Sequence, residues 1–388
     1  MANVSLVAGN QLSLLQNGAE YFPQLASDIE AAQHSVFLET YIFEADQIGS
    51  MISAALQRAA RRGVKVRVML DGFGSAELPQ VWAAELATAG VELQWFRPEI
   101  SPFTLQRNRR RRLRRLHRKL AAIDDAIAYV GGINIIDDIP RGGNIAAPRL
   151  DYAVRVEGLL AHEVTEEMRH LWGVVKWATL RRRIGRMRAQ LRRKPHQTEA
   201  GSLQFLLRDN LRHRRDIERA YLQAIAAARS EVIIANAYFL PGRPLRQALK
   251  AAAARGVRVV LLLQGRVEHR LQHYATLALY GQLLEDGIEL YQYHHSFLHA
   301  KVGVVDGDWA TVGSSNLDPF SLLLAREANL VVRDTDFSGA LRGSLLQAIQ
   351  SGGRRVGHAT LPPLTLLLAR LSYGLIRLLM NLFAGLRQ

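Results

Sequence analysis

One polar pattern occurs twice in this chain. It consists of His-x-Lys, four further residues, Asp, six further residues and Gly-x-x-Asn, and it spans residues 117–134 and again 299–316. Three other pairs of segments match in the same order, namely 35–43 with 231–239, 61–70 with 254–263, and 89–96 with 286–293. A repeat of this length indicates two copies of one structural unit, so the fold has to be built from two similar halves.

Each half is predicted to alternate strands and helices. The matched segments are short runs with β-strand character, and helical patterns such as 48–63 and 245–256 lie between them. This alternation predicts an α/β fold with a mostly parallel sheet. The composition, 48% hydrophobic, is enough for two packed cores. We expect a first domain at residues 1–180, a basic linker at 181–200, a second domain at 201–352 and a C-terminal tail at 353–388.

The repeated polar pattern itself predicts a β-hairpin. In the second copy, the Asp-Gly pair at 306–307 is a strong turn signal between two apolar runs. Because side chains alternate along a strand, His299 and Lys301 are expected to share the face opposite the core. The first copy repeats this arrangement, except that Arg118 lies on the face that should point to the core.

Two such motifs brought together supply the groups that a phosphodiester reaction needs. A neutral imidazole can attack phosphorus and form a covalent phosphohistidine. A second, protonated imidazole can give a proton to the departing alcohol and later take one from the incoming alcohol. Charge that gathers on the phosphate oxygens needs ammonium and amide donors, and the candidates are Lys119, Lys301, Asn134 and Asn316. A charged lysine has no lone pair for zinc, so we expect no metal.

Four carboxylates accompany the motifs. A nucleophilic imidazole needs its far nitrogen held by an acceptor, and Asp151 and Glu327 stand at matching places after the two motifs. We expect each of them to hold the His of its own copy. Asp124 and Asp306 belong to the catalytic motif but end their strands at a turn. We therefore expect them to fix backbone or a cationic side chain rather than to carry protons.

Charge and cysteine content limit the partners. The formal net charge of +15 favours an anionic partner, either nucleic acid or an acidic membrane surface. A basic insertion at 97–112 leads directly into the first motif, so we expect it at the mouth of the site. The absence of cysteine excludes disulfides and thiolate metal sites. The N-terminus lacks the basic and apolar regions of a signal peptide, so we expect the chain to stay on the cytoplasmic side.

The tail at 361–388 is rich in leucine. On a helix, its few polar residues and a glycine form one narrow stripe, which consists of Arg370, Gly374, Arg377, Asn381 and Gln388. So wide an apolar arc favours a helix that lies in the interface of a membrane. The alternative is a C-terminal helix that docks on the body of the protein or on a second subunit.

The two His-x-Lys motifs with their Asp and Gly-x-x-Asn resemble those of the phospholipase D superfamily, and the duplication covers most of the chain. The resemblance implies a duplicated α/β/α sandwich, with two pseudo-twofold-related domains that share one active site. It also implies two-step phosphatidyl transfer without a cofactor, with His117 as nucleophile and His299 as general acid and base. The twofold symmetry makes this assignment reversible on sequence alone. The family favours Gly-Ser-x-Asn, which adds Ser314 as a phosphate-binding residue, whereas the first copy has Gly132 there.

Within the superfamily, residues 39–49, 62–75 and 296–322 are similar to the bacterial cardiolipin synthases of the shorter type, which lack N-terminal transmembrane helices. This implies transfer of a phosphatidyl group to a second phosphatidylglycerol, with release of glycerol. The protein would be peripheral, on the cytoplasmic face of the cell (inner) membrane. Glu39 and Asn236, at strand ends that correspond in the two copies, are candidates to line the cleft.

Other functions use the same motifs. A hydrolytic phospholipase D takes water as the acceptor, and a phosphodiester nuclease would suit the net charge. The leucine-rich tail argues against nucleic acid as the partner. A membrane-binding module with a relict site is disfavoured, because both His-Lys pairs and both orienting carboxylates are intact. The donor headgroup, the acceptor and the oligomeric state stay open at this point.

Overall fold

The computed structural model describes residues 4–97, 115–139, 147–184, 202–209, 213–318, 325–357 and 362–384. Apart from Arg97, the expected basic insertion lies outside these ranges, and so do residues 185–200 of the expected linker.

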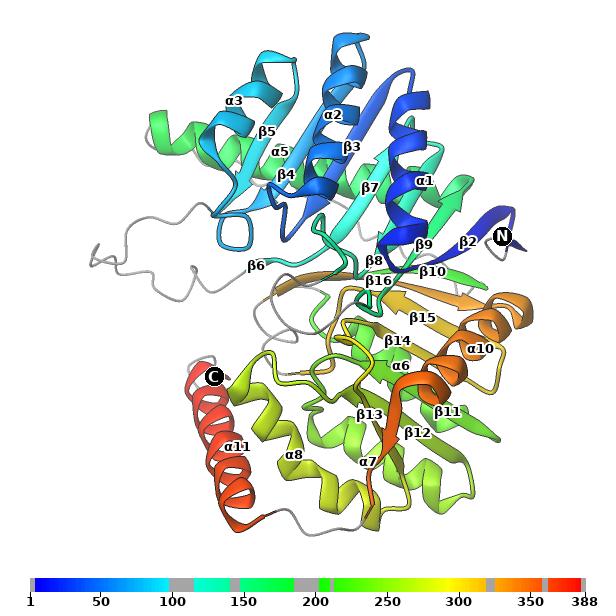
Figure 1. Ribbon diagram of the computed structural model, residues 1–388. Coiled ribbons are helices and arrows are strands. Elements are labelled where there is room, and N and C mark those ends of the chain that lie inside the picture. The colour runs from blue at the N-terminus through cyan, green and yellow to red at the C-terminus, as the bar shows by residue number, and fades with distance from the viewer. Residues whose placement is uncertain are drawn as a thin grey trace.

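The N-terminal half contains one sheet with helices on both of its faces (Figure 1). In chain order its elements are β1 (Val4–Val7), β2 (Asn10–Gln16), α1 (Asn17–Ala31), β3 (Ser35–Thr40), α2 (Gln47–Arg61), β4 (Lys65–Asp71), α3 (Gln80–Thr88), β5 (Glu92–Phe96), β6 (Arg115–Leu116), β7 (Lys119–Ile123), β8 (Ile127–Gly131), β9 (Tyr152–Glu157) and α5 (Leu159–Ile184). Eight strands lie in the order β1-β2-β9-β8-β7-β3-β4-β5. Helix α5 continues to Ile184, so residues 181–184, expected in the linker, are helical.

The C-terminal half repeats this plan. Its elements are β10 (Leu203–Arg208), α6 (Asp216–Ala227), β11 (Glu231–Asn236), α7 (Arg243–Ala254), β12 (Arg258–Gln264), α8 (Arg270–Glu285), β13 (Glu289–Tyr293), β14 (Lys301–Val305), β15 (Trp309–Gly313), β16 (Ala325–Arg333), α10 (Thr335–Gly352), β17 (Gly353–Arg355) and α11 (Pro363–Ala384). The strands lie in the order β10-β16-β15-β14-β11-β12-β13-β17, and β6 of the first half pairs with β16. Because β17 pairs with β13, the second sheet extends into the expected tail.

The expectation of a mostly parallel sheet is wrong. Among the described strands, only β3, β4 and β5 in the first half and β11, β12 and β13 in the second half pair in parallel along the sheets. Each motif forms the hairpin that its sequence predicts, β7-β8 and β14-β15, and a hairpin necessarily pairs antiparallel. The hairpin joins the parallel strands through β3 and β11, also antiparallel, so each sheet is mixed.

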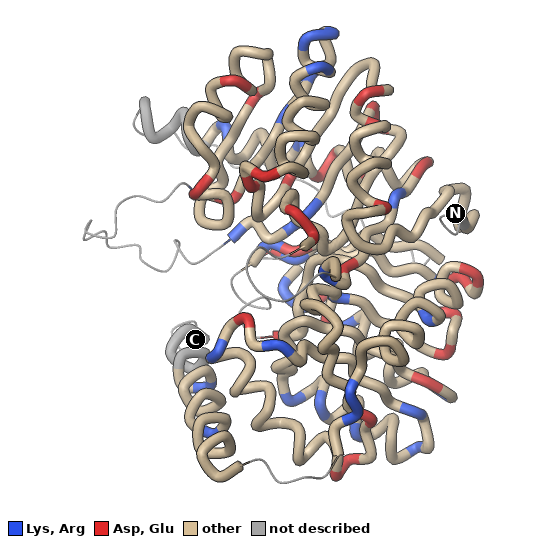
Figure 2. Tube along the Cα trace, in the orientation of Figure 1, with Lys and Arg blue, Asp and Glu red and all other residues tan. Residues whose placement is uncertain are grey.

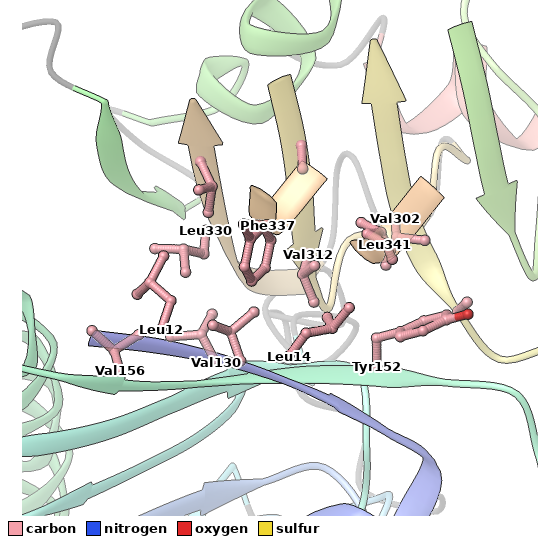
Figure 3. Packing of buried hydrophobic residues seen from close by; sticks show 14 of the residues in the cluster. Leu12, Leu14, Val130, Tyr152, Val156, Val302, Val312, Leu330, Phe337 and Leu341 are labelled. Atoms are coloured by element: carbon pink, nitrogen blue, oxygen red, sulfur yellow. The ribbon is translucent and has the colours of Figure 1, made fainter. Parts of the chain in front are cut away.

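The two halves pack against each other through one continuous apolar core. Helices α1, α2 and α3 cover the outer face of the first sheet and α6, α7 and α8 that of the second, whereas α5 and α10 lie on the inner side. The inner core joins side chains from both sheets and from α10 (Figure 3), including Leu12, Leu14, Val130, Val156, Val302, Val312, Leu330, Phe337 and Leu341. Each such buried side chain contributes roughly 1.5–3 kcal/mol, which holds the halves in one fixed arrangement.

Helix α11 docks on the body of the protein, which was the alternative considered for the tail. It packs along α8 (Figure 1), with Ala369 and Ile376 fully buried against it. Its other face leaves large apolar side chains exposed, namely Leu364, Leu366, Leu367, Leu368, Leu371, Leu375 and Leu378. Among the described residues, no helix is long and apolar enough to cross a membrane.

Arg118, which the strand pattern places on the core-facing side, is buried in an ion pair. Its Nε and Nη2 donate to Glu39 Oε2 and Oε1 at 2.8 and 3.0 Å, and its Nη1 lies 3.4 Å from Glu167 Oε1. Glu39 is therefore engaged in the core and is not a cleft residue. Asn236 does not correspond to it either, because Asn236 pairs with Lys301 whereas Glu39 pairs with Leu120.

We predict that Arg118→Met lowers the free energy of unfolding by about 3–5 kcal/mol, since it leaves the Glu39 carboxylate buried without its main partner. Urea unfolding followed by circular dichroism measures this. The double variant Arg118→Met/Glu39→Gln removes the uncompensated charge and should recover a large part of the loss. A single variant as stable as the wild type would show that the pair does not stabilise the core.

Candidate active site

The two motifs meet where the halves join, and each is anchored by the opposite half. The backbone N–H of His117 donates to the carbonyl of Arg326 at 3.0 Å, directly after β6 has paired with β16. The backbone N–H of His299 donates to the carbonyl of Leu150 at 2.9 Å, at the matching place before β9. The backbone before each catalytic His is thus paired with a strand end of the opposite half. Both histidines therefore lie in one shared region.

Each imidazole is held by a carboxylate of the opposite half. His117 Nδ1 lies 3.0 Å from both carboxylate oxygens of Glu327, and His299 Nδ1 lies 2.6 Å from Asp151 Oδ2. The expectation that each carboxylate holds the His of its own copy is therefore wrong. Within one sheet, β8 separates β7 from β9, whereas the exchanged strand ends place each carboxylate beside the other motif. With Nδ1–H donated to the carboxylate, each ring presents Nε2 as its reactive atom.

The two carboxylates are supported differently. Ser314 is fully buried, and its Oγ donates to Glu327 Oε2 at 2.6 Å. It therefore orients the carboxylate and is not available to a phosphate, which corrects its expected role. At the equivalent place in the first half, a Cβ on Gly132 would lie 2.3 Å from Asp151 Oδ1. The Gly132 of the first copy is thus required by the position of the aspartate.

The two lysines are buried between these groups. Lys119 Nζ donates to the His117 carbonyl at 2.8 Å, and Lys301 Nζ donates to the His299 carbonyl. Burial lowers the pKa of Lys119 to about 7, with a smaller contribution from the charge of Lys301 and opposition from Glu327. Burial also lowers the pKa of Lys301. An anionic phosphodiester between them would favour the charged form of each lysine, so the pair is suited to binding one.

Burial favours the neutral form of both imidazoles in the free site. Burial lowers the pKa of His117, against the opposing effect of Glu327. Burial and the charge of Lys301 lower the pKa of His299 to about 4. Burial alone would raise the pKa of Asp151, but the charge of Lys301 and the hydrogen bond with His299 keep it below its usual value. A neutral ring with a free Nε2 lone pair is the form that can attack phosphorus.

The two motif asparagines are both buried but differ in their contacts. Asn134 Oδ1 accepts a hydrogen bond from the backbone N–H of Ile42 at 3.2 Å, which directs its Nδ2 away from that strand end. Asn316 Oδ1 has no hydrogen-bond partner among the described residues. Their role as phosphate donors stays a prediction.

The motif aspartates are not part of the reacting centre. Asp124 follows β7, roughly 16 Å along the strand from Lys119. Its carboxylate accepts from the backbone N–H groups of Gln33, His34 and Ser35 at 2.7–2.8 Å. Asp306 binds the backbone of 229–231 in the same way. Both fix the loop before the neighbouring strand, so counting them as catalytic residues is wrong.

Sequence reasoning missed three residues around the motifs. Asp71 Oδ2 accepts from the backbone N–H of Leu116 at 2.7 Å, and Gln264 Oε1 accepts from that of Leu298 at 3.2 Å, so each fixes the residue before a catalytic His. The ring of Tyr41 packs edge-on against His117, with centroids 4.9 Å apart. The matched segments 61–70 and 254–263 end just before Asp71 and Gln264, and this position was the available signal.

No group of three or more His, Cys, Asp or Glu side chains that could hold a metal ion occurs in the described part of the chain. The expectation of a reaction without metal or cofactor stays a prediction.

Comparison with known proteins gives consistent matches along the chain. A family model described as cardiolipin synthase, PLD-like domain, matches residues 25–172 and 221–347. Cardiolipin synthase B of Salmonella typhi is 42% identical over 92% of this chain and 84% of that protein, and cardiolipin synthase B of Escherichia coli (strain K12) is 40% identical over the same shares. A cardiolipin synthase of Geobacillus kaustophilus is 31% identical over 84% of this chain and 64% of that protein.

Two solved structures share the fold. Phosphatidylserine synthase of Haemophilus influenzae Rd KW20 superposes with a TM-score of 0.70 at 15% identity, covering 96% of this chain and 94% of that one. Polyphosphate kinase of Porphyromonas gingivalis gives a TM-score of 0.59 at 12% identity, covering 95% of this chain and 53% of that one. Together, the family model and the relatives show that this chain belongs to the cardiolipin synthase, PLD-like domain family.

Proposed function

We propose that this protein is a phospholipase D-type phosphatidyltransferase that makes cardiolipin from two molecules of phosphatidylglycerol and releases glycerol. The observation that carries the proposal is the pair of neutral imidazoles, each with Nδ1 held by a buried carboxylate and with two buried lysines beside them. The names of the relatives favour this lipid substrate over other phosphodiesters.

In the first step, Nε2 of His117 attacks the phosphorus of phosphatidylglycerol. The P–N bond forms as the bond between phosphorus and the glycerol oxygen breaks, and His299 gives its proton to that oxygen. The bound phosphate is anionic, so it raises the pKa of the adjacent His299. His299 then takes up a proton from solvent and becomes the general acid. Glu327 stabilises the positive charge that develops on the His117 ring.

In the second step, a hydroxyl of a second phosphatidylglycerol attacks the phosphohistidine. His299, now neutral, takes the proton of this hydroxyl as the new P–O bond forms and the P–N bond breaks. Cardiolipin then leaves, and His299 gives its proton to solvent, so the free site returns to two neutral imidazoles. The ammonium groups of Lys119 and Lys301 stabilise the charge on the phosphate oxygens in both steps.

Incubation of the purified protein with phosphatidylglycerol vesicles in the presence of EDTA tests the proposed function, because the mechanism uses only side chains of the chain itself. Mass spectrometry should detect cardiolipin together with free glycerol. Phosphatidic acid without cardiolipin would instead mean a hydrolytic phospholipase D. Strong inhibition by EDTA would contradict the metal-free mechanism.

The roles of the two histidines are separable with a donor that has a good leaving group, such as a phosphatidyl ester of p-nitrophenol. His299→Ala lacks the general acid and base, so transfer from phosphatidylglycerol should fall by about 10²–10⁴-fold. Nitrophenol needs no general acid, so this variant should still release a burst of one equivalent. His117→Ala should give no burst, and the opposite pattern would reverse the two roles.

We also propose that the protein binds the cytoplasmic face of the inner membrane through α11. Apart from Leu366, its exposed leucines lie on one side of the helix, and the described part of α11 carries two arginines and no acidic residue (Figure 2). An apolar face flanked by basic residues is the pattern of a helix that lies in a membrane interface. The net charge of +15 adds attraction to anionic lipid.

Sedimentation with anionic phosphatidylglycerol vesicles tests this membrane surface. The double variant Leu367→Ser/Leu371→Ser removes two side chains that are 53% and 60% exposed in the free protein, and binding should weaken about tenfold or more. Leu6→Ser/Leu159→Ser is the matched control, because these leucines are also exposed but lie outside α11. Equal binding by the test variant and the control would contradict the proposal.

A further inference from the structure

The first motif has an aromatic neighbour at a place where the second copy has none. The ring of Tyr41 packs edge-on against the ring of His117, with centroids 4.9 Å apart. The ammonium nitrogen of Lys119 lies over the same Tyr41 ring, 5.4 Å from its centroid. At the matching place in the second copy the residue is Ala237, which has no ring. One side chain of the first copy therefore contacts both the imidazole and the ammonium group of its motif.

The place of the Tyr41 ring is fixed by the residues around it. The Tyr41 carbonyl accepts a hydrogen bond from Ser75 Oγ at 2.9 Å. The backbone N–H of the next residue, Ile42, donates to Asn134 Oδ1 at 3.2 Å. A Cβ on Gly74 would lie 2.8 Å from two carbon atoms of the Tyr41 ring, so this position needs a glycine. The backbone at Tyr41 is thus held on both sides, and the ring has a space that the chain leaves open for it.

The charge of Lys119 needs such support in the free site. Lys119 is buried, and its ammonium group donates to an uncharged acceptor, the carbonyl of His117, at 2.8 Å. Burial lowers the pKa of Lys119 to about 7, the charge of Glu327 opposes this shift, and that of Lys301 adds to it. Near neutral pH, Lys119 is therefore divided between its charged and neutral forms. The titratable and charged groups that face it are His117, Lys301, Glu327, Asp151 and Asp71.

The Tyr41 ring can stabilise the charged form of Lys119. The π system of an aromatic ring attracts a cation over its face, and 5.4 Å from the centroid is within the range of this interaction. The attraction acts on the ammonium form and not on the neutral amine. Burial raises the pKa of Tyr41 to about 12, so the ring itself stays uncharged where Lys119 titrates. Tyr41 therefore favours the ammonium form of Lys119 over the whole of that pH range.

We propose that Tyr41 is a positioning residue of the first motif, whose ring holds Lys119 in the charged form that binds the phosphate and packs against His117 to fix the orientation of the imidazole. The inference rests on the proposed function, in which His117 attacks the phosphorus. Lys119 is then charged before the donor lipid binds, whereas Ala237 gives Lys301 no such support. The donor phosphate thus meets a charged lysine on the side of the nucleophile.

The pH dependence of kcat/KM, measured with the full-length protein, tests this role, because kcat/KM reports the ionisation of the free enzyme. The donor is a phosphatidyl ester of p-nitrophenol, whose leaving group needs no general acid, so the alkaline limb does not report His299. Loss of the ring lowers the pKa of Lys119, and activity needs its charged form. Tyr41→Leu should therefore lose activity about 0.5–1 pH unit earlier as the pH rises. Tyr41→Phe keeps an aromatic ring and should retain the alkaline limb of the wild type.

Tyr373→Leu is the matched control for the loss of a tyrosine that faces a cation. The guanidinium group of Arg377 lies over the Tyr373 ring, 5.9 Å from its centroid, but this pair is on α11, outside the site. The control should have the alkaline limb of the wild type. An unshifted limb in Tyr41→Leu overturns the inference. An equal shift in Tyr41→Phe also overturns it, because the effect would then belong to the hydroxyl group.

Should Tyr41→Leu fail to fold, phenylalanines with increasing fluorination of the ring at position 41 decide the question. These side chains keep the shape of the ring and weaken its attraction for a cation. The alkaline limb should move to lower pH with each added fluorine, and a limb that stays in place overturns the inference. A wild type that releases no nitrophenol at any pH overturns the proposed function as well.

Discussion

The crossed contact between each imidazole and the carboxylate of the opposite half is the interaction on which the rest of the site depends. Glu327 reaches His117 and Asp151 reaches His299 only because the strand ends of the two sheets are exchanged at the boundary. Neither half can therefore form a complete imidazole–carboxylate pair by itself. The apolar core shared by both sheets keeps these pairs in register, so the packing of the halves is also a condition for catalysis.

Duplication supplies two equal motifs, and small differences around them give the two copies different tasks. Ser314 orients Glu327, while Gly132 leaves room for the shorter Asp151. The Tyr41 ring packs edge-on against His117, whereas the residue at the matching place in the second copy is Ala237. A reaction with one nucleophile and one acid and base needs such an asymmetry, and here it comes from the neighbours of the motifs rather than from the motifs themselves.

Much of the fold and the identity of the reacting groups could be predicted from the sequence, because a repeated motif of defined spacing constrains both. The partners of the histidines could not, since matching the copies to each other does not reveal which half a strand end faces. The partner of Arg118 could not be predicted either, because Glu39 lies on a different strand. The role of Ser314 depends on a neighbouring carboxylate that spacing alone does not place. The sheets are mixed because each hairpin pairs antiparallel with β3 or β11, and the alternation of strands and helices along the chain does not indicate that pairing.

The most direct test of this account compares Glu327→Gln with Asp151→Asn in a rapid-quench experiment, using a radiolabelled donor with a good leaving group. The crossed arrangement predicts that Glu327→Gln slows formation of the phosphohistidine at His117, although the two residues lie in different halves. It also predicts that Asp151→Asn forms this intermediate and then accumulates it, because only the acid and base is impaired. Loss of the intermediate in Asp151→Asn, with normal formation in Glu327→Gln, would contradict the account.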